Sequence, residues 1–301
     1  HYFNNQTKAA LDNNGSLVVG AAIGIRNDYL ENAAQLISAG VDLICIDVAN
    51  GHNMHTIKAV KTIRNLYPNI IIMVGNVCTA EGFYNLANAD CDCIRVGIGN
   101  SSICSTRLET GVGFGQFSSV NECYDTKTRY CIDTHIICDG GSLGKTGNKV
   151  KALASGSSAI IMGKTLASCE ESPGSIIIRN GKRMKYYRGM ASTMANISKN
   201  EKINKNITNG TSTYESIINI SKNRKRKAIT QTAEGVDGVV ELKGSVEEIL
   251  TQICGGIRSG FSYQGCKNIK ELHKLRRQYK LEWGTVTAIG MNETGIRVKT
   301  F

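Results

Sequence analysis

Residues 41–48 read V-D-L-I-C-I-D-V, and residues 69–76 read N-I-I-I-M-V-G-N. Both are short apolar runs that contain or end in polar residues, and an amphipathic segment follows each of them. Strands that are apolar on both faces are typical of a parallel sheet that is covered by helices on one side and packed on the other. The two runs therefore predict consecutive βα units.

The same pattern recurs along the chain at a spacing of very roughly 25 residues, which is typical of repeated βα units. The predicted strands are 17–23, 43–48, 70–75, 91–96, 134–138 and 158–162. Because each is followed by a glycine or a polar residue, we expect the ligand site at the carboxyl ends of several strands, as in a (β/α)8 TIM barrel. We predict this α/β fold with about six of the eight barrel units present.

A doubly wound sheet is the alternative architecture, and it would place a ligand at a single switch point of the sheet. The run Gly97-Ile98-Gly99 lacks the third glycine of the dinucleotide-binding fingerprint. A nicotinamide cofactor would therefore have to bind in another way.

The composition is that of an ordinary globular protein, with 301 residues, 41% apolar and 20% charged. No apolar run of about 18 residues and no charged-then-apolar leader is present, so we expect no membrane span and a cytoplasmic location. The formal net charge is +11, and much of the excess falls within residues 222–227. We interpret this run as a solvated loop rather than a nucleic-acid site, and the positive field suits anionic substrates.

The segment 97–113 reads G-I-G-N-S-S-I-C-S-T-R-L-E-T-G-V-G and directly follows the predicted strand 91–96. Its glycines allow the backbone to turn sharply and to approach a ligand. Cys104 stands among serines and threonines, and Arg107 follows it; a nearby guanidinium favours the nucleophilic thiolate. The chain has eleven cysteines, an odd count that favours free thiols, so a buried structural role for Cys104 is the alternative.

The text S-I-C-S-T-R at 102–107, followed by T-G-V-G at 110–113, resembles the catalytic loop of the IMP dehydrogenase/GMP reductase family. Other segments resemble the same family in the same order: D-V-A-N-G-H at 47–52, G-N-V at 75–77, C-D-G-G at 138–141, I-M-G-K at 161–164, Y-Y-R-G-M-A-S at 186–192 and A-E-G-V at 233–236. The resemblance implies a purine nucleotide (GMP or IMP) as substrate, NADPH or NAD as cofactor, and a homotetramer.

Residue roles follow from this resemblance alone. It implies catalytic roles for Cys104, Thr106 and Glu234. It implies nucleotide contacts from Ser102, Asp139, Gly140, Gly141, Gly163, Lys164, Tyr187, Gly189, Met190 and Ala191. It implies cofactor contacts from Asp47, Asn50 and Asn76. It also implies a potassium ion (K+) held by backbone carbonyls of Gly99, Ser101 and Cys104, with serine at 101 where the family usually has glycine.

The direction of the reaction separates the two activities of the family. A dehydrogenase hydrolyses the covalent purine intermediate with an Arg-Tyr pair on a flap, and the polar segment 193–232, predicted to be that flap, has no such pair. We therefore favour the reductase, which would convert GMP to IMP with NADPH. Oxidation of IMP to XMP with NAD and an inactive nucleotide-binding remnant are the alternatives.

The run L-V-V-G-A-A-I-G at 17–24 resembles the third strand of the family barrel. We therefore expect a truncated chain, a split gene product, or a barrel completed by a separate chain that supplies the missing strands. Residues 1–301 are predicted as one catalytic domain, with the barrel core at 17–192 and 233–276 and a C-terminal tail at 277–301.

Overall fold

The computed structural model describes residues 10–26, 28–101, 103–141, 144–189, 237–278, 280–285 and 294–298. Within them the chain divides into two compact units. The first comprises the described residues up to Gly97, together with Ser118–Cys138 and Gly156–Ala159, and the second comprises the described residues of Ile98–Phe117 and Asp139–Ser155 and those from Ile160 onward. No helix in the described part of the chain is long and apolar enough to cross a membrane.

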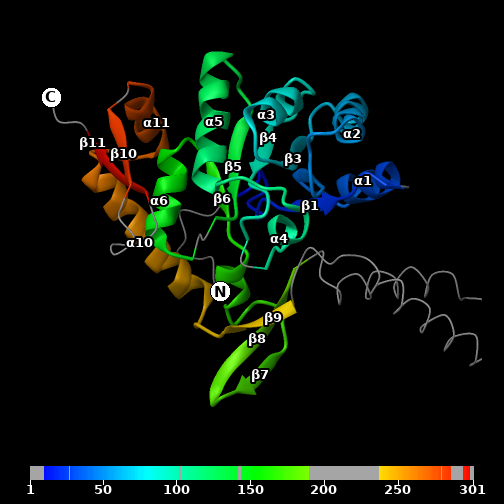
Figure 1. Ribbon diagram of the computed structural model, residues 1–301. Helices are drawn as coiled ribbons and strands as arrows, with labels where there is room; N and C mark the ends of the chain where they lie inside the picture. The colour runs from blue at the N-terminus through cyan, green and yellow to red at the C-terminus, as the bar shows by residue number, and fades with distance from the viewer. Residues whose placement is uncertain are drawn as a thin grey trace, which may run out of the picture. The chain divides into compact units, whose positions relative to one another are not determined.

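Six strands are hydrogen-bonded in sequence order β1-β2-β3-β4-β5-β6 (Figure 1). They are β1 (Gly20–Ile23), β2 (Leu43–Asp47), β3 (Ile71–Val77), β4 (Cys93–Val96), β5 (His135–Asp139) and β6 (Ala159–Ile161). The pairings from β1 to β5 are parallel. The predicted fold class, a partial (β/α) barrel with six parallel strands, is confirmed. The first strand begins at Gly20 rather than at the predicted residue 17, and the side chains of 17–19 are exposed.

Helices alternate with these strands. They are α1 (Tyr29–Ser38), α2 (Met54–Leu66), α3 (Ala80–Ala87), α4 (Thr106–Thr110), α5 (Gln116–Arg129), α6 (Thr146–Ala154) and α7 (Lys164–Ala167). Asn53 and Thr79 cap α2 and α3 by accepting backbone N–H bonds, which explains why those helices begin there.

The core of the first unit takes every second residue of its strands. Ile44 and Ile46 of β2, Ile72 and Val74 of β3, and Ile94 of β4 are fully buried. Fully buried apolar residues of α2 and α3 complete this core: Val60, Ile63, Phe83 and Leu86. The intervening strand residues, such as Cys45 and Met73, are only partly buried. The apolar runs therefore place one face in the core, while their other face is less covered than the sequence predicted.

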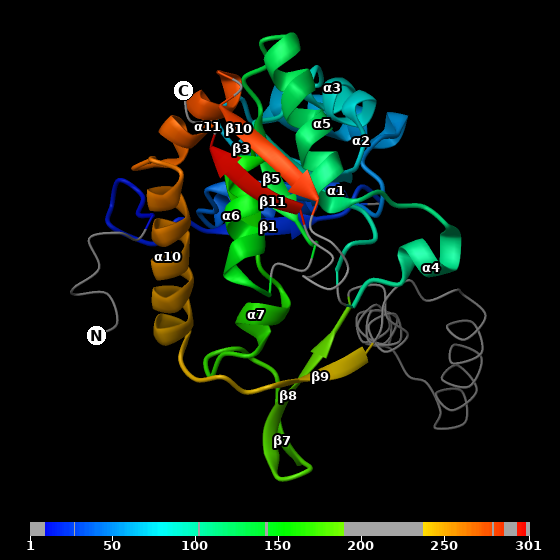
Figure 2. The ribbon, with the colours of Figure 1, turned by 60° about the vertical axis from the view of Figure 1, so that its left-hand side comes forward.

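The second unit holds a helical cluster and a hairpin. Helices α10 (Val246–Tyr263) and α11 (Ile269–Arg277) pack with α6, and α6 and α10 run side by side in Figure 2. The predicted tail contains an antiparallel hairpin of β10 (Leu281–Thr285) and β11 (Thr294–Val298). Leu281 belongs to the apolar core of this cluster, and Trp283 packs against it.

An antiparallel sheet of β7 (Ile176–Arg179), β8 (Lys182–Arg188) and β9 (Asp237–Glu241) completes the second unit, and the sequence did not predict it. Lys185 of β8 is only 1% exposed. Its ammonium donates to the backbone carbonyls of Cys169 at 2.8 Å and Glu170 at 2.6 Å, and also to that of Ser172. A buried cation thus ties β8 to the segment 169–172.

Candidate functional site

The cysteine loop, residues 97–113, carries Cys104, and its described residues from Ile98 onward lie in the second unit. Cys104 is partly exposed, and its Sγ donates to Oγ1 of Thr106 at 3.2 Å. Its backbone N–H donates to the carbonyl of Ser101 at 3.1 Å. Thr106 is the first residue of α4, so the short helix fixes the hydroxyl beside the thiol. Two of the three predicted catalytic side chains are therefore in contact.

Arg107 has a different environment from the one that the sequence predicted. Its guanidinium donates to the side-chain oxygen of Asn100 and to the carbonyl of Phe114, the latter at 2.7 Å. These contacts hold the loop in shape. The side chain also fills the space beside Gly113, where an added Cβ would lie 2.8 Å from Arg107 Nε.

Several of the predicted site residues lie near the phenol of Tyr187. Its Oη would be 2.6 Å from a Cβ added to Gly163, so any side chain at 163 would have to displace the ring. Burial raises the pKa of Tyr187 above its usual value, and the Asp139 carboxylate raises that pKa further. A hydrogen bond with the Ser101 side chain lowers the pKa in part. The phenol therefore lies near the end of β5, the start of α7 and the cysteine loop.

Four other residues predicted to bind the nucleotide differ in backbone conformation and in exposure. Gly140 and Gly141 follow β5 with φ values of 99° and 76°, a left-handed conformation that favours glycine. Lys164 is exposed at the first position of α7, while Gly189 is buried directly after β8. An exposed lysine beside Gly163 is suited to an anionic group.

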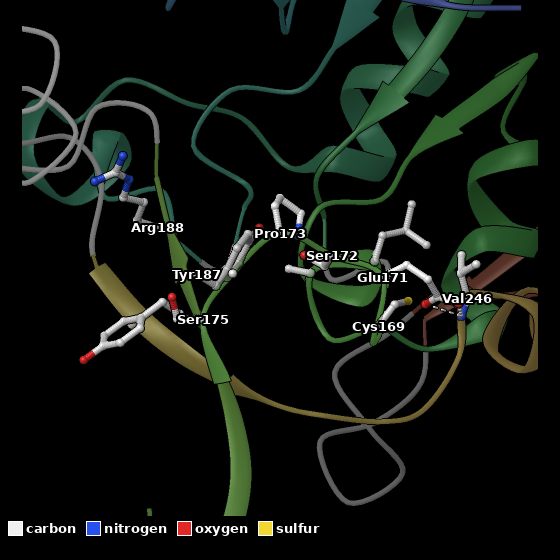
Figure 3. A pocket seen from close by; sticks show the side chains of 13 residues that line it. Cys169, Glu171, Ser172, Pro173, Ser175, Tyr187, Arg188 and Val246 are labelled. Atoms are coloured by element: carbon white, nitrogen blue, oxygen red, sulfur yellow. Dashed lines mark hydrogen bonds between the residues drawn. The ribbon is translucent and has the colours of Figure 1, made fainter. Parts of the chain in front are cut away.

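A cavity of about 950 Å³ lies beside Tyr187 in the second unit (Figure 3). It is lined by residues of α7, the 169–175 segment, β8 and the start of α10. Glu171 on its wall accepts the backbone N–H of Val246 at 2.9 and 3.2 Å, which caps the N-terminus of α10. Tyr187 therefore lines this cavity and also lies next to Gly163.

The three predicted cofactor residues lie in the first unit. Asp47 ends β2, and its carboxylate forms an ion pair with Arg95 of β4 at 2.7 Å. Gly75 of β3 pairs with both residues in the sheet register and has no side chain to separate them. Asp47 is still 39% exposed and can accept ribose hydroxyls. Arg95 was not predicted, although a glycine inside a strand signals such a close approach.

Asn76 and Asn50 are held close to Asp47 by backbone bonds. Asn76 N–H donates to the Val48 carbonyl at 3.0 Å, and its own carbonyl accepts from Gly51 N–H at 2.7 Å. Its side chain donates to the carbonyl of Gly97 at 2.7 Å. Asn50 is exposed in the segment that follows β2, where its side chain accepts from His52 N–H. The structure therefore brings the backbone of the Asp47–Gly51 segment and that of Asn76 into contact.

The predicted potassium ligands are backbone carbonyls. Ser101 is absent from the non-glycine residues with positive φ in the described chain, which are Asp90, Cys131 and Asn180. Serine is therefore compatible with the backbone at this position. The carbonyl of Ser101 accepts from Cys104 N–H and keeps a second lone pair. The described residues contain no group of three or more His, Cys, Asp or Glu side chains arranged for a metal.

Other predicted residues lie outside the described part of the chain. They are Ser102, Met190, Ala191 and Glu234, together with the predicted flap at 193–232. Cys91 and Cys123 are buried, and burial raises the pKa of both thiols. These cysteines are core residues, as the sequence predicted for most of the eleven.

The family model described as "IMP dehydrogenase / GMP reductase domain" matches residues 3–296. An inosine-5'-monophosphate dehydrogenase from Nitrosopumilus maritimus is 38% identical over 266 residues, which cover 88% of this chain and 52% of the relative. A GMP reductase from Leishmania major is 35% identical over 289 residues, which cover 95% of this chain and 54% of the relative. The chain therefore spans about half the length of these relatives.

A solved structure has a similar fold. The crystal structure of GMP reductase C318A from Trypanosoma brucei in complex with guanosine 5'-monophosphate aligns with a TM-score of 0.77 and 31% sequence identity. The alignment covers 99% of this chain and 53% of that chain.

Proposed function

Because this chain belongs to the IMP dehydrogenase/GMP reductase family of oxidoreductases, we propose that it carries the site for NADPH-dependent reductive deamination of GMP to IMP. The observation that carries the proposal is the contact between Cys104 Sγ and Thr106 Oγ1 at 3.2 Å in a partly exposed loop. It places a nucleophile and a proton-handling hydroxyl together.

In the proposed reaction, the Cys104 thiolate adds to carbon 2 of the purine and forms a covalent bond. The 2-amino group then leaves as ammonia, and Thr106 and Glu234 supply and remove the protons. A nicotinamide cofactor held by Asp47, Asn50 and Asn76 would supply the hydride that carbon 2 accepts. The carbon–sulfur bond breaks as IMP forms, and the thiolate is regenerated.

The nucleotide is proposed to lie against Tyr187, Asp139 and Gly163, with its phosphate toward Gly140, Gly141, Lys164 and Ser102. Gly189, Met190 and Ala191 would hold the purine through backbone groups. Asp47, Asn50 and Asn76 would hold the cofactor ribose. The accessible Asp47 carboxylate supports this assignment, because carboxylate oxygens accept hydrogen bonds from ribose hydroxyls. The carbonyls of Gly99, Ser101 and Cys104 would hold potassium.

IMP dehydrogenase is the second candidate, with NAD as cofactor and XMP as product. The relatives that favour it are inosine-5'-monophosphate dehydrogenases, including the Nitrosopumilus maritimus protein at 38% identity. The reductase is supported by the 31% identical structural neighbour and by the absence of an Arg-Tyr pair in the sequence of 193–232.

The two activities are separated by one assay. The purified chain is supplied with GMP and NADPH, or with IMP and NAD, and the absorbance of reduced cofactor is followed. The proposal predicts steady loss of NADPH with GMP, and at most a burst of NADH with IMP. Sustained formation of XMP at a comparable rate would replace the reductase with the dehydrogenase. Cys104→Ala should abolish either reaction, with a fall of at least about 1000-fold.

A further inference from the structure

Asn100 connects the cysteine loop to the segment that follows β5. Its side-chain amide donates to Gln116 Oε1 at 2.8 Å, and its side-chain oxygen accepts from Arg107. Its backbone carbonyl accepts the N–H of Gly141 at 2.8 Å. One residue thus uses its side chain to shape the loop and its backbone to contact the Asp139–Gly141 segment.

The glycines of that segment are needed for this contact. A Cβ added to Gly140 would lie 3.2 Å from Asn100 Cβ. A Cβ added to Gly141 would lie 2.4 Å from Gln116 Cγ. The family resemblance assigned these glycines to nucleotide contacts, and the structure shows that they also make room for Asn100 and Gln116. The two segments are therefore in close contact.

The cysteine loop needs contacts that fix its conformation, because its glycine-rich backbone has many accessible conformations. Gly97, Gly99, Gly111 and Gly113 all have positive φ, and α4 is only five residues long. Ordering glycine-rich backbone costs conformational entropy, which contacts within the folded loop must offset. The side-chain oxygen of Asn100 accepts from Arg107, and its side-chain nitrogen donates to Gln116. The position of Cys104 therefore depends on this network.

We propose that Asn100 is a positioning residue that couples the Asp139–Gly141 segment to the placement of the Cys104 thiol. Occupation of that segment by the ribose phosphate of the substrate orders Gly141, and the Gly141–Asn100 bond transmits the order to the cysteine loop. The proposal rests on the proposed function in assigning ribose phosphate to this segment. It concerns how the nucleophile is oriented, which is independent of the direction of the reaction.

Ribose 5-phosphate is the probe, because it has the sugar and the phosphate but no purine to cover the thiol. The rate of alkylation of Cys104 by iodoacetamide is measured by mass spectrometry, with and without saturating ribose 5-phosphate. We expect the sugar phosphate to change the rate in the wild-type chain by about fivefold or more, a typical coupling between sites. In Asn100→Leu the rate should not respond, although calorimetry still detects ribose 5-phosphate binding.

Conservative variants separate positioning from folding. In Asn100→Asp the carboxylate still accepts from Arg107, and the Gln116 amide can turn to donate, so the response to ribose 5-phosphate should persist. Gln116→Met keeps most of the packing against Gly141 and removes the side-chain amide that accepts from Asn100, so the response should weaken even where Asn100→Leu fails to fold. Asn121→Leu is the matched control, because the Asn121 amide donates to Asp125 within α5 at 3.1 Å and belongs to neither segment.

The turnover of GMP provides the second measurement. Asn100→Leu should lower kcat by about 100-fold, which is typical of a displaced reacting group, while KM for GMP changes by less than about threefold. An equal response to ribose 5-phosphate in Asn100→Leu and wild type, no response in wild type, or an unchanged kcat would each overturn the proposal. Failure of the proposed function is distinct, because the wild-type chain would then form XMP from IMP or turn over neither nucleotide, whereas this proposal is judged by the response of Cys104 alkylation to ribose 5-phosphate.

Discussion

Arg95 on β4 reaches Asp47 on β2 across the strand between them, with 2.7 Å from Nη1 to Oδ1. The residue of β3 in register with both is Gly75, and an added Cβ there would lie 2.7 Å from Arg95 Cβ. The ion pair therefore depends on a glycine inside a strand. Arg95 is only 15% exposed, so its charge is less screened by water than that of a surface arginine.

We predict that Arg95→Met weakens cofactor binding, because Asp47 would no longer be held in one orientation. KM for NADPH should rise about 5- to 30-fold, as expected for a loss of one to two kcal/mol, with a smaller change in KM for GMP. Steady-state kinetics with each substrate varied in turn measures both values. Lys182→Met is the control, since it breaks an exposed ion pair with Glu241 on the neighbouring strand β9. An equal rise in both KM values would contradict the assignment.

The cysteines of the chain should differ widely in reactivity. Cys104 is partly exposed, and Cys131 and Cys254 are exposed, whereas Cys91 and Cys123 are buried with raised pKa values. Because the thiolate is the reactive form, iodoacetamide at pH 8 should modify the first three at least about 100-fold faster than the buried two. GMP should protect Cys104 and leave Cys131 and Cys254 unchanged. Peptide mapping by mass spectrometry reads out every site, and protection of all three by GMP would point to a general conformational change.

Stability should fall at alkaline pH because of a partly buried thiol, that of Cys93. Burial, with Asp92 and Cys45 as smaller causes, raises the pKa of Cys93 from 9.0 to about 11. The folded state keeps the proton in this range while the unfolded state loses it, so the free energy of unfolding decreases as pH rises. The contribution of Cys93 is complete below about pH 9 and is lost toward about pH 11.

The expected slope is about 1.4 kcal/mol per pH unit for each such thiol. This slope is measured by urea unfolding at a series of pH values from pH 8 to pH 11, spaced by roughly half a pH unit. Cys93→Ala should flatten the decrease by the contribution of one group. Cys131→Ala, at an exposed thiol, should leave the slope as it is. A slope that does not change in Cys93→Ala would show that other groups cause the alkaline loss.

The parallel strands could be predicted from sequence because the pattern that marks them is local. In the runs at 43–48 and 70–75, buried residues alternate with more exposed ones as far as Ile46 and Val74, and the apolar side chains are adjacent in the chain. The β8–β9 pairing could not be predicted in this way. It joins Tyr187 to Gly238 across about fifty intervening residues, and neither short strand is strongly apolar.

The candidate site shows the same division. Cys104 and Thr106 are close in sequence, so their loop could be recognised from its residues and its family resemblance. The partnership of Arg95 with Asp47 depends on sheet register, and that of Asn100 with Gly141 depends on two loops from different strands. The residue spacing predicts Arg107 beside the thiol, whereas its guanidinium binds Asn100 and Phe114. A long side chain such as that of arginine can bond to several different partners, and the spacing of residues in the sequence does not specify which.

Lys185 provides the last prediction, because a fully buried ammonium that bonds to three carbonyls is costly to remove. Lys185→Met preserves most of the volume but leaves the carbonyls of the 169–172 segment without their donor. We expect a loss of about 3 kcal/mol in the free energy of unfolding, measured by urea titration. Glu171 in the same segment caps α10, so that helix should lose amide protection first in hydrogen exchange. Lys182→Met, exposed on the same strand, should change stability by less than about 1 kcal/mol. A Lys185→Met variant as stable as Lys182→Met would show that water replaces the ammonium and that the segment does not depend on it.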